Sequence, residues 1–144
     1  MKNNISCQIL IAENIMFDPK EKKHTAYNIL NKITVPILPA SVITSVLFKF
    51  QFSKEGELEE INNKILVYNS NEEIVYSGQL PKLKNLRDNR MTPGIDGVIE
   101  IRFPVMESGK YEYVVYSNNQ KIFTYPLFID VIQTEEKDME LYKK

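Results

Sequence analysis

Few side chains in this sequence could carry out nucleophilic chemistry. His24 is the only histidine and Cys7 is the only cysteine among the 144 residues. Nucleophilic catalysis needs a base held against the nucleophile and a third group that orients the base. His24 lies in the charged segment KEKKHT, for which we predict an exposed loop without an orienting carboxylate. Cys7 alternates with Ile9 and Ile11, which favours a small buried hydrophobic residue.

Glu13 is the carboxylate with the least ordinary surroundings. It interrupts the apolar face formed by Ile9, Ile11 and Ile15. A carboxylate there is costly unless it is paired, and a raised pKa would suit a general acid or base. General acid–base hydrolysis usually needs a second carboxylate, and none stands at a matching spacing. The expectation is therefore a residue at a strand end that bonds backbone amides or a nearby lysine, and we predict no catalytic residue and no enzymatic activity.

The usual ligands of metals and nucleotides are also missing. Zinc sites draw mainly on Cys and His, and this chain has one of each. A calcium site would need clustered carboxylates, but the sequence contains no Asp-x-Asp run, and aspartates such as Asp18, Asp88, Asp96 and Asp130 are scattered. Only 5 residues are glycine, so a glycine-rich phosphate loop is not expected. We predict no metal and no cofactor.

Composition and charge place the chain among ordinary globular proteins. Its 144 residues suit one domain, with 43% hydrophobic and 26% charged residues. A net charge of -1 gives no long-range attraction to nucleic acid or to an anionic membrane. One cysteine allows no internal disulfide, which favours a reducing compartment. Gln8 and Glu13 break the first apolar run, and no later run reaches the roughly 20 residues of a membrane span. We therefore expect a cytoplasmic protein.

Apolar and polar residues alternate with the period of a β-strand through most of the chain. The clearest such segment is VITSVLFKFQF. One face of this predicted strand carries the polar residues Ser45, Lys49 and Gln51, and the other carries the apolar residues Val42, Val46, Phe48, Phe50 and Phe52. Tyr111, Tyr113 and Val115 share a face in the same way. Polar segments predict three hairpins: DPKEKKH joins CQILIAENIMF to AYNILNKITV, NSNEE joins KILVY to EIVYSGQL, and SNNQK precedes a long second arm.

These segments, with GVIEIRFPV, amount to about eight strands, as expected for an all-β sandwich or barrel. Pro126 cannot donate a ladder hydrogen bond and is expected at a bulge, a bend or an edge. Residues 81–96 are predicted to be the longest irregular connection, with much of the local positive charge and one helical turn. We predict a β-sandwich domain over residues 1–132 and a charged C-terminal tail, residues 133–144, able to form a short helix.

The segment ESGKYEYVVYSNNQKIFTYPLFI resembles the Gly-x-Tyr-x-aromatic strand, turn and closing strand of many immunoglobulin-like sandwiches. Tyr111 falls where those folds place a tyrosine that hydrogen-bonds across a corner. The Cys-Trp-Cys core of antibody domains is absent. A longer pattern, from ILIAENIMFDPKEKKHTAYNILNKITVPILPA through ILVYNSNEEIVYSG to this hairpin, is similar to that of small uncharacterised bacterial proteins grouped as a domain of unknown function. The resemblance implies an immunoglobulin-like antiparallel β-sandwich of about 7–8 strands, and it brings no activity or cofactor.

From these observations we predict a non-catalytic, cytoplasmic bacterial β-sandwich that binds another protein or associates with itself. Exposed tyrosines, the charged loop or an open sheet edge would make the contacts. The candidate partner-binding residues are Tyr68, Tyr76, Lys84, Arg87, Arg90 and Tyr116.

Two other functions stay open at this stage. A small-ligand or glycan-binding module is the main alternative, because eight tyrosines could serve as platforms although Trp is absent. Nucleic-acid binding is less favoured. Lys82, Lys84, Arg87 and Arg90 could contact phosphates, but flanking acidic residues leave the domain neutral.

Overall fold

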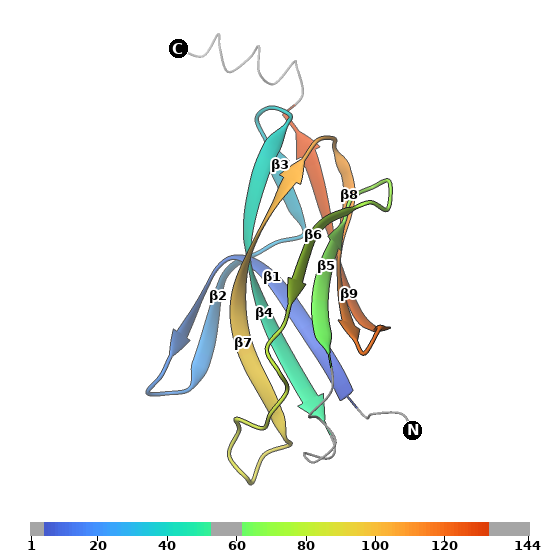
Figure 1. Cartoon of the computed structure of the whole chain (residues 1–144). Helices are drawn as coiled ribbons and strands as arrows, with labels where there is room; N and C mark the ends of the chain where they lie inside the picture. The colour runs from blue at the N-terminus through green and yellow to red at the C-terminus, as the bar shows by residue number, and fades with distance from the viewer. Residues whose placement is uncertain (1–4, 53–61, 133–144) are drawn as a thin grey trace.

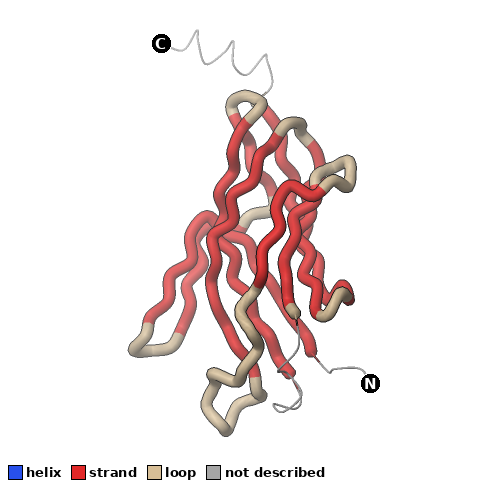
Figure 2. The backbone as a smooth tube through the Cα atoms, in the orientation of Figure 1, coloured by secondary structure: helices blue, strands red, loops and turns tan. Residues whose placement is uncertain are grey.

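The computed structural model describes residues 5–52 and 62–132, and all regular structure in these ranges is β-strand (Figure 1, Figure 2). The strands form two sheets, one with the order β2-β1-β4-β7 and one with the order β3-β9-β8-β5-β6. We call them the four-strand sheet and the five-strand sheet. Their bounds are β1 Ile5–Asp18, β2 Lys23–Ile29, β3 Lys32–Val35, β4 Ala40–Phe52, β5 Asn63–Tyr68, β6 Ile74–Gln79, β7 Gly94–Val105, β8 Gly109–Ser117 and β9 Gln120–Val131.

The two sheets have the strand order of an immunoglobulin-like sandwich. Strands β1, β4 and β7 stand in the places of A, B and E, and they face β5, β8 and β9 in the places of C, F and G. Strands β2, β3 and β6 extend this framework at the sheet edges. The prediction of an all-β immunoglobulin-like sandwich is therefore confirmed. One pairing departs from the antiparallel expectation, because β3 runs parallel to β9.

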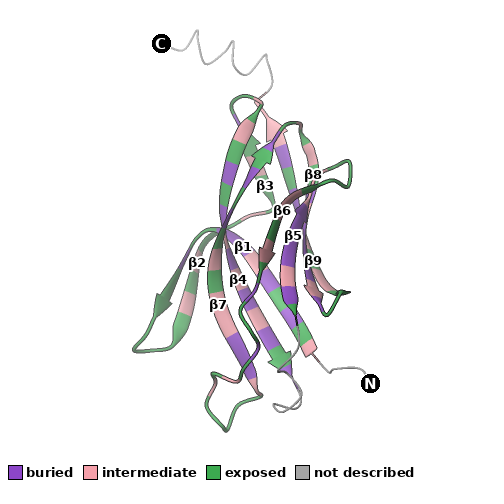
Figure 3. Ribbon diagram, viewed as in Figure 1, coloured by how far each residue is buried: buried purple, intermediate pink, exposed green. Residues whose placement is uncertain are grey.

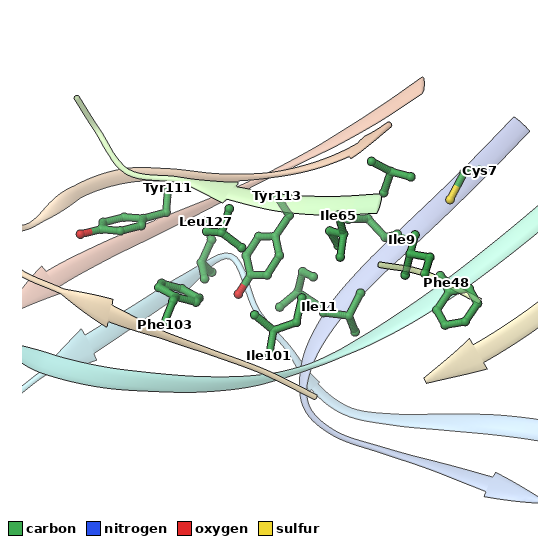
Figure 4. Close-up of a cluster of buried hydrophobic side chains, with 14 of the residues drawn as sticks. Cys7, Ile9, Ile11, Phe48, Ile65, Ile101, Phe103, Tyr111, Tyr113 and Leu127 are labelled. Atoms are coloured by element: carbon green, nitrogen blue, oxygen red, sulfur yellow. The ribbon is translucent and has the colours of Figure 1, made fainter. Parts of the chain in front are cut away.

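The inner faces of the sheets meet in one hydrophobic core, as the alternation of buried and exposed residues along the strands shows (Figure 3). All five apolar residues predicted on one face of β4 are buried, as are Tyr111, Tyr113 and Val115 of β8. The ring of Phe103 in β7 stacks on Tyr111 at 5.7 Å and meets Tyr113 edge-on at 6.0 Å (Figure 4). The buried Tyr113 hydroxyl lies 2.7 Å from that of Thr44, so neither polar group is left without a partner.

The start of β8 carries the corner hydrogen bond that the resemblance implied. The Tyr111 hydroxyl donates to the backbone carbonyl of Glu107 at 2.8 Å, four residues upstream. This bond ties the turn between β7 and β8 to the core, since the Tyr111 ring itself is buried.

The described residues form nine strands rather than 7–8, because the segment predicted as one strand, AYNILNKITV, divides between the two sheets. The N–H of Leu30 bonds the carbonyl of Ile11 in β1, whereas the carbonyl of Asn31 accepts the N–H of Phe128 in β9. Consecutive residues thus bond to different sheets, and β3 begins at Lys32. Period-two alternation records burial but not which sheet a strand joins.

The long connection also differs from its prediction. Residues 81–93 form no helical turn, and β7 begins at Gly94. The Asn85 side-chain carbonyl accepts the N–H groups of Arg87 and Gly94 at 3.0 and 3.1 Å, and Leu86 N–H bonds the Gly94 carbonyl. These local bonds use backbone donors that a helix would need.

Two further predictions concern the last third of the chain. Pro126 lies inside β9, opposite Glu112 of β8. The pairing of β9 with β3 begins only at Phe128, so the side of β9 away from β8 is a free edge at Pro126, as expected for a proline. The tail predicted to form a short helix lies outside the described residues. Among the described residues, the structure contains no helix with the length and apolar character of a membrane span.

Candidate functional site

Arg87, predicted to bind a partner, instead holds the long connection to the sandwich. Its guanidinium donates to both carboxylate oxygens of Asp96, at 3.1 and 2.8 Å, and to the Thr92 carbonyl at 3.2 Å. The Lys49 ammonium lies 3.1 Å from the same carboxylate. Only 9% of the Arg87 side chain is exposed, so little of it could reach a partner. The prediction missed this because Asp96 lies in β7, nine residues away.

The Asp96 carboxyl responds to these neighbours. Burial alone would raise its pKa, but hydrogen bonds and positive charge from Arg87 and Lys49 hold the pKa below its ordinary value. Asp96 is therefore ionised at neutral pH, and the three side chains form a charged clamp between the connection, β4 and β7.

Lys84 and Arg90 are exposed, as predicted, but the Arg90 guanidinium already pairs with Asp88 at 3.1 Å. The loop that carries them is fixed to the four-strand sheet through Arg87, whereas Tyr68, Tyr76 and Tyr116 belong to the five-strand sheet. The predicted set therefore does not form one site.

Tyr68 and Tyr116 do meet, on the outer face of the five-strand sheet. Lys64 pairs with Tyr116, Leu66 with Val114, and Tyr68 with Glu112. The two tyrosines thus stand diagonally on either side of the Leu66–Val114 pair, and their hydroxyls lie 3.0 Å apart. This tyrosine arch explains why Leu66 and Val114 are buried although they face away from the core.

The arch also changes the acidity of the Tyr68 phenol. The hydrogen bond from Tyr116, with some burial, raises the pKa of Tyr68 to about 12. The Lys64 ammonium lies 5.6 Å from the centre of the Tyr116 ring, within reach of a cation–π interaction. The Tyr68 phenol therefore stays neutral over the ordinary pH range.

Tyr76 does not join the arch, which corrects its predicted outward orientation. Tyr76 pairs with the fully buried Val67, and residues directly opposite in a sheet share a face. Its ring packs against the core and covers Gly78, where an added Cβ would lie 2.5 Å from the Tyr76 hydroxyl. The register of β5 with β6 is regular from Gln79 to Tyr76, and it shifts only at the next pair, where Tyr68 lies opposite Ile74.

A surface pocket of about 460 Å³ adjoins the tyrosine arch. Its lining combines the two arch tyrosines with Lys110, Glu112 and Lys121 and with part of the β5–β6 turn. Sequence reasoning singled out the tyrosines but missed the charged residues, because strand pairing brings Lys110, Glu112 and Lys121 beside them. Aromatic, acidic and basic groups thus line one concave surface.

A second feature is the arm, residues 13–29, which contains the distal half of β1 and all of β2. Strand β1 pairs with β4 only as far as Ala12 and then continues with β2 as its partner. The arm stands away from the body of the sandwich (Figure 1). Met16 and Ile29 are 55% and 56% exposed, and Phe17 and Tyr27 are about half exposed as well.

The outer face of the four-strand sheet is unusually apolar where the arm departs. Leu10 of β1 pairs with Leu47 of β4, which pairs with Val98 of β7, so the three form a row across the sheet. A hollow of about 230 Å³ lies beside β1 at the end of this row, and its lining includes Leu10, Leu47, Lys49 and Phe123. The register places the exposed residues Met16, Tyr27, Ile29 and Ile43 on the same face as this row. We call the whole set the outer apolar surface: Leu10, Met16, Tyr27, Ile29, Ile43, Leu47 and Val98.

The residues considered for catalysis lie apart from both surfaces. Glu13 is exposed where β1 leaves β4, and it accepts a hydrogen bond from the Asn28 side chain at 2.9 Å. The prediction that Glu13 stands at a strand end is wrong, because it lies inside β1. His24 lies within β2 rather than in a loop, half-buried against Phe17 with ring centres 4.8 Å apart. Cys7 is buried as predicted, and burial raises the pKa of its thiol to about 12. A thiol of this kind is a poor nucleophile.

No family model and no curated protein matches the sequence. Membership of the family of unknown function therefore stays a prediction. Among solved structures, the chain is similar to an immunoglobulin-like protein from Pseudomonas aeruginosa, with 9% identity over 87% of this chain and 95% of the other, and a TM-score of 0.41. A likeness at this level carries no information on function.

Proposed function

We propose that this protein is a non-catalytic binding module that recognises a protein, either a different chain or a second copy of itself, through the outer apolar surface. The observation that carries the proposal is the exposure of Met16, Tyr27, Ile29 and Ile43 on one side of one sheet. Apolar residues that are exposed together on one face are a feature of interaction sites, whereas single exposed apolar residues are common on any protein surface. The single buried Cys7 supports a cytoplasmic setting.

The shape of the surface favours a macromolecule over a small ligand. Its residues lie on the three strands β1, β4 and β7 and continue along β2 in the arm. A protein partner can cover such a width, whereas most of a small ligand's surface is enclosed by a concave pocket. Within the part of the chain that the structure describes, the outer edge of β2 in the arm has no strand partner, so backbone pairing can add to side-chain contacts.

Replacing Ile29 by glutamate is expected to weaken partner binding at least about tenfold, because a charge would be buried at the interface. Ile74 offers a matched control, since it is also a strand isoleucine, 57% exposed against 56% for Ile29, but lies in the five-strand sheet. Tagged wild type, Ile29→Glu and Ile74→Glu proteins would be used to capture partners, and light scattering would measure the mass of each purified protein.

The proposal requires a stoichiometric partner or a dimer that wild type and Ile74→Glu retain and Ile29→Glu loses. Two results would contradict it: a wild-type protein with neither partner nor self-association, or equal loss of binding in both variants.

A further inference from the structure

The pocket beside the tyrosine arch has a rigid rim. The Asn69 side-chain carbonyl accepts the N–H groups of Asn71 and Glu73, both at 2.9 Å, and its amide donates to the Glu73 carboxylate at 3.1 Å. Ser70 and Asn71 of the same turn both donate to the Glu107 carboxylate, which follows β7. The β5–β6 turn is thus fixed to the neighbouring corner. A pocket formed in advance binds without the cost of ordering its own walls.

The charges that line this pocket balance. Lys110 and Lys121 supply two ammonium groups, and Glu72 and Glu112 supply two carboxylates. An anionic ligand would meet the two carboxylates, and a cationic ligand would meet the two lysines. A neutral ligand with many hydroxyl groups can instead donate to the carboxylates and accept from the ammonium groups, and such charge-assisted hydrogen bonds are the stronger ones.

The arch contributes an aromatic surface to the same pocket. Tyr68 and Tyr116 are each half-buried, and both line the pocket. Phenol rings offer an apolar face to the C–H groups of a sugar, while their hydroxyls add hydrogen-bonding capacity at the edge. The volume of about 460 Å³ lies within the range of small-molecule sites, roughly 300–1,000 Å³.

From the balanced charge, the tyrosine rings and the fixed rim we infer that this pocket binds a neutral carbohydrate of about two sugar units. The site is on the five-strand sheet and the proposed protein interface is on the four-strand sheet, so the two functions are independent. In the complex, Glu112 and Glu72 accept from sugar hydroxyls, Lys110 and Lys121 donate to sugar oxygens, and Tyr116 and Tyr68 contact the ring.

The test is a titration of isotope-labelled full-length protein with four neutral disaccharides, namely cellobiose, maltose, lactose and diacetylchitobiose, monitored by amide NMR shifts. At least one of the four is expected to bind with millimolar or lower Kd and to shift the amides of Lys110, Glu112 and Tyr116. If lactose is among the ligands, its sialylated, negatively charged form is expected to bind more weakly.

Two variants and one control separate sugar binding from structural damage. Tyr116→Ala and Glu112→Gln are each expected to weaken binding about tenfold or more, the effect of losing a ring contact or a charge-assisted hydrogen bond. Glu100→Gln removes an exposed carboxylate from β7 of the four-strand sheet instead and should leave binding unchanged. The inference is overturned if none of the four sugars binds at millimolar concentration, if only charged ligands bind, or if Glu112→Gln binds as the wild type does.

Discussion

Replacing Phe103 by alanine is expected to lower the free energy of unfolding by about 3–5 kcal/mol. Phe103 is only 1% exposed, and its ring contacts Tyr111 and Tyr113 from the opposite sheet. Alanine would leave a cavity between the two sheets that neither rigid tyrosine ring can fill, because both hydroxyls are held by hydrogen bonds. Urea unfolding of the wild type and the variant, followed by circular dichroism, measures the difference.

Phe128→Ala is the matched control, because Phe128 is also a strand phenylalanine but is 46% exposed in β9. The same truncation there is expected to cost less than about 1 kcal/mol, since little packing is lost. Similar losses in the two variants, or a loss below about 1 kcal/mol for Phe103→Ala, would contradict the packing of β7 against β8.

The second large effect concerns the charged clamp. Arg87→Ala is expected to reduce the free energy of unfolding by about 2 kcal/mol at neutral pH, less than for a fully buried pair because Asp96 keeps some solvent contact. Without Arg87 the Asp96 carboxylate keeps Lys49 but loses its two guanidinium hydrogen bonds. The connection before β7 also loses its main attachment. Urea unfolding at a series of pH values measures the effect.

The pH dependence of this effect has a definite sign. The folded pKa of Asp96 is lowered, so the unfolded chain binds the proton more readily and the clamp contributes stability above the unfolded pKa of about 3.9. That contribution falls as the pH drops through the folded pKa, so the difference between wild type and Arg87→Ala should shrink in acid. Arg90→Ala should change stability little at any pH, because its pair with Asp88 is exposed. A difference that grows on acidification would refute the clamp.

Strand alternation was enough to predict the core and the hairpins. In β4, period and burial agree from Val42 to Phe52. In β8, Tyr111, Tyr113 and Val115 are buried as the alternation predicts, whereas the burial of Val114 on the other face comes from the tyrosine arch. The resemblance to immunoglobulin-like folds added the corner bond of Tyr111, which composition could not supply.

The candidate sites were less predictable, because they depend on pairings between distant residues. The pairing with Val67 that places Tyr76 on the inner face is found only once β5 and β6 are aligned. Arg87 is predicted to bind another protein because the sequence does not show its ion pair with Asp96, which is found only once β7 is placed. The outer apolar surface did leave a signal, since Leu10 and Leu47 break the polar side of their strands. Apolar residues on the face of a strand that is expected to meet solvent are the sequence feature that indicates the outer apolar surface.

Both proposed surfaces depend on which side of each sheet is sealed in the core. The most direct test is the reactivity of a single thiol moved by one residue along β1. Cys7 is 4% exposed, whereas its neighbour Ser6 is exposed on the other face. The wild-type thiol should react with a thiol reagent such as Ellman's only after unfolding, and a Ser6→Cys, Cys7→Ala protein should react at once in the folded state. Rapid labelling of native Cys7, or protection of the thiol at position 6, would contradict the assignment of the two faces.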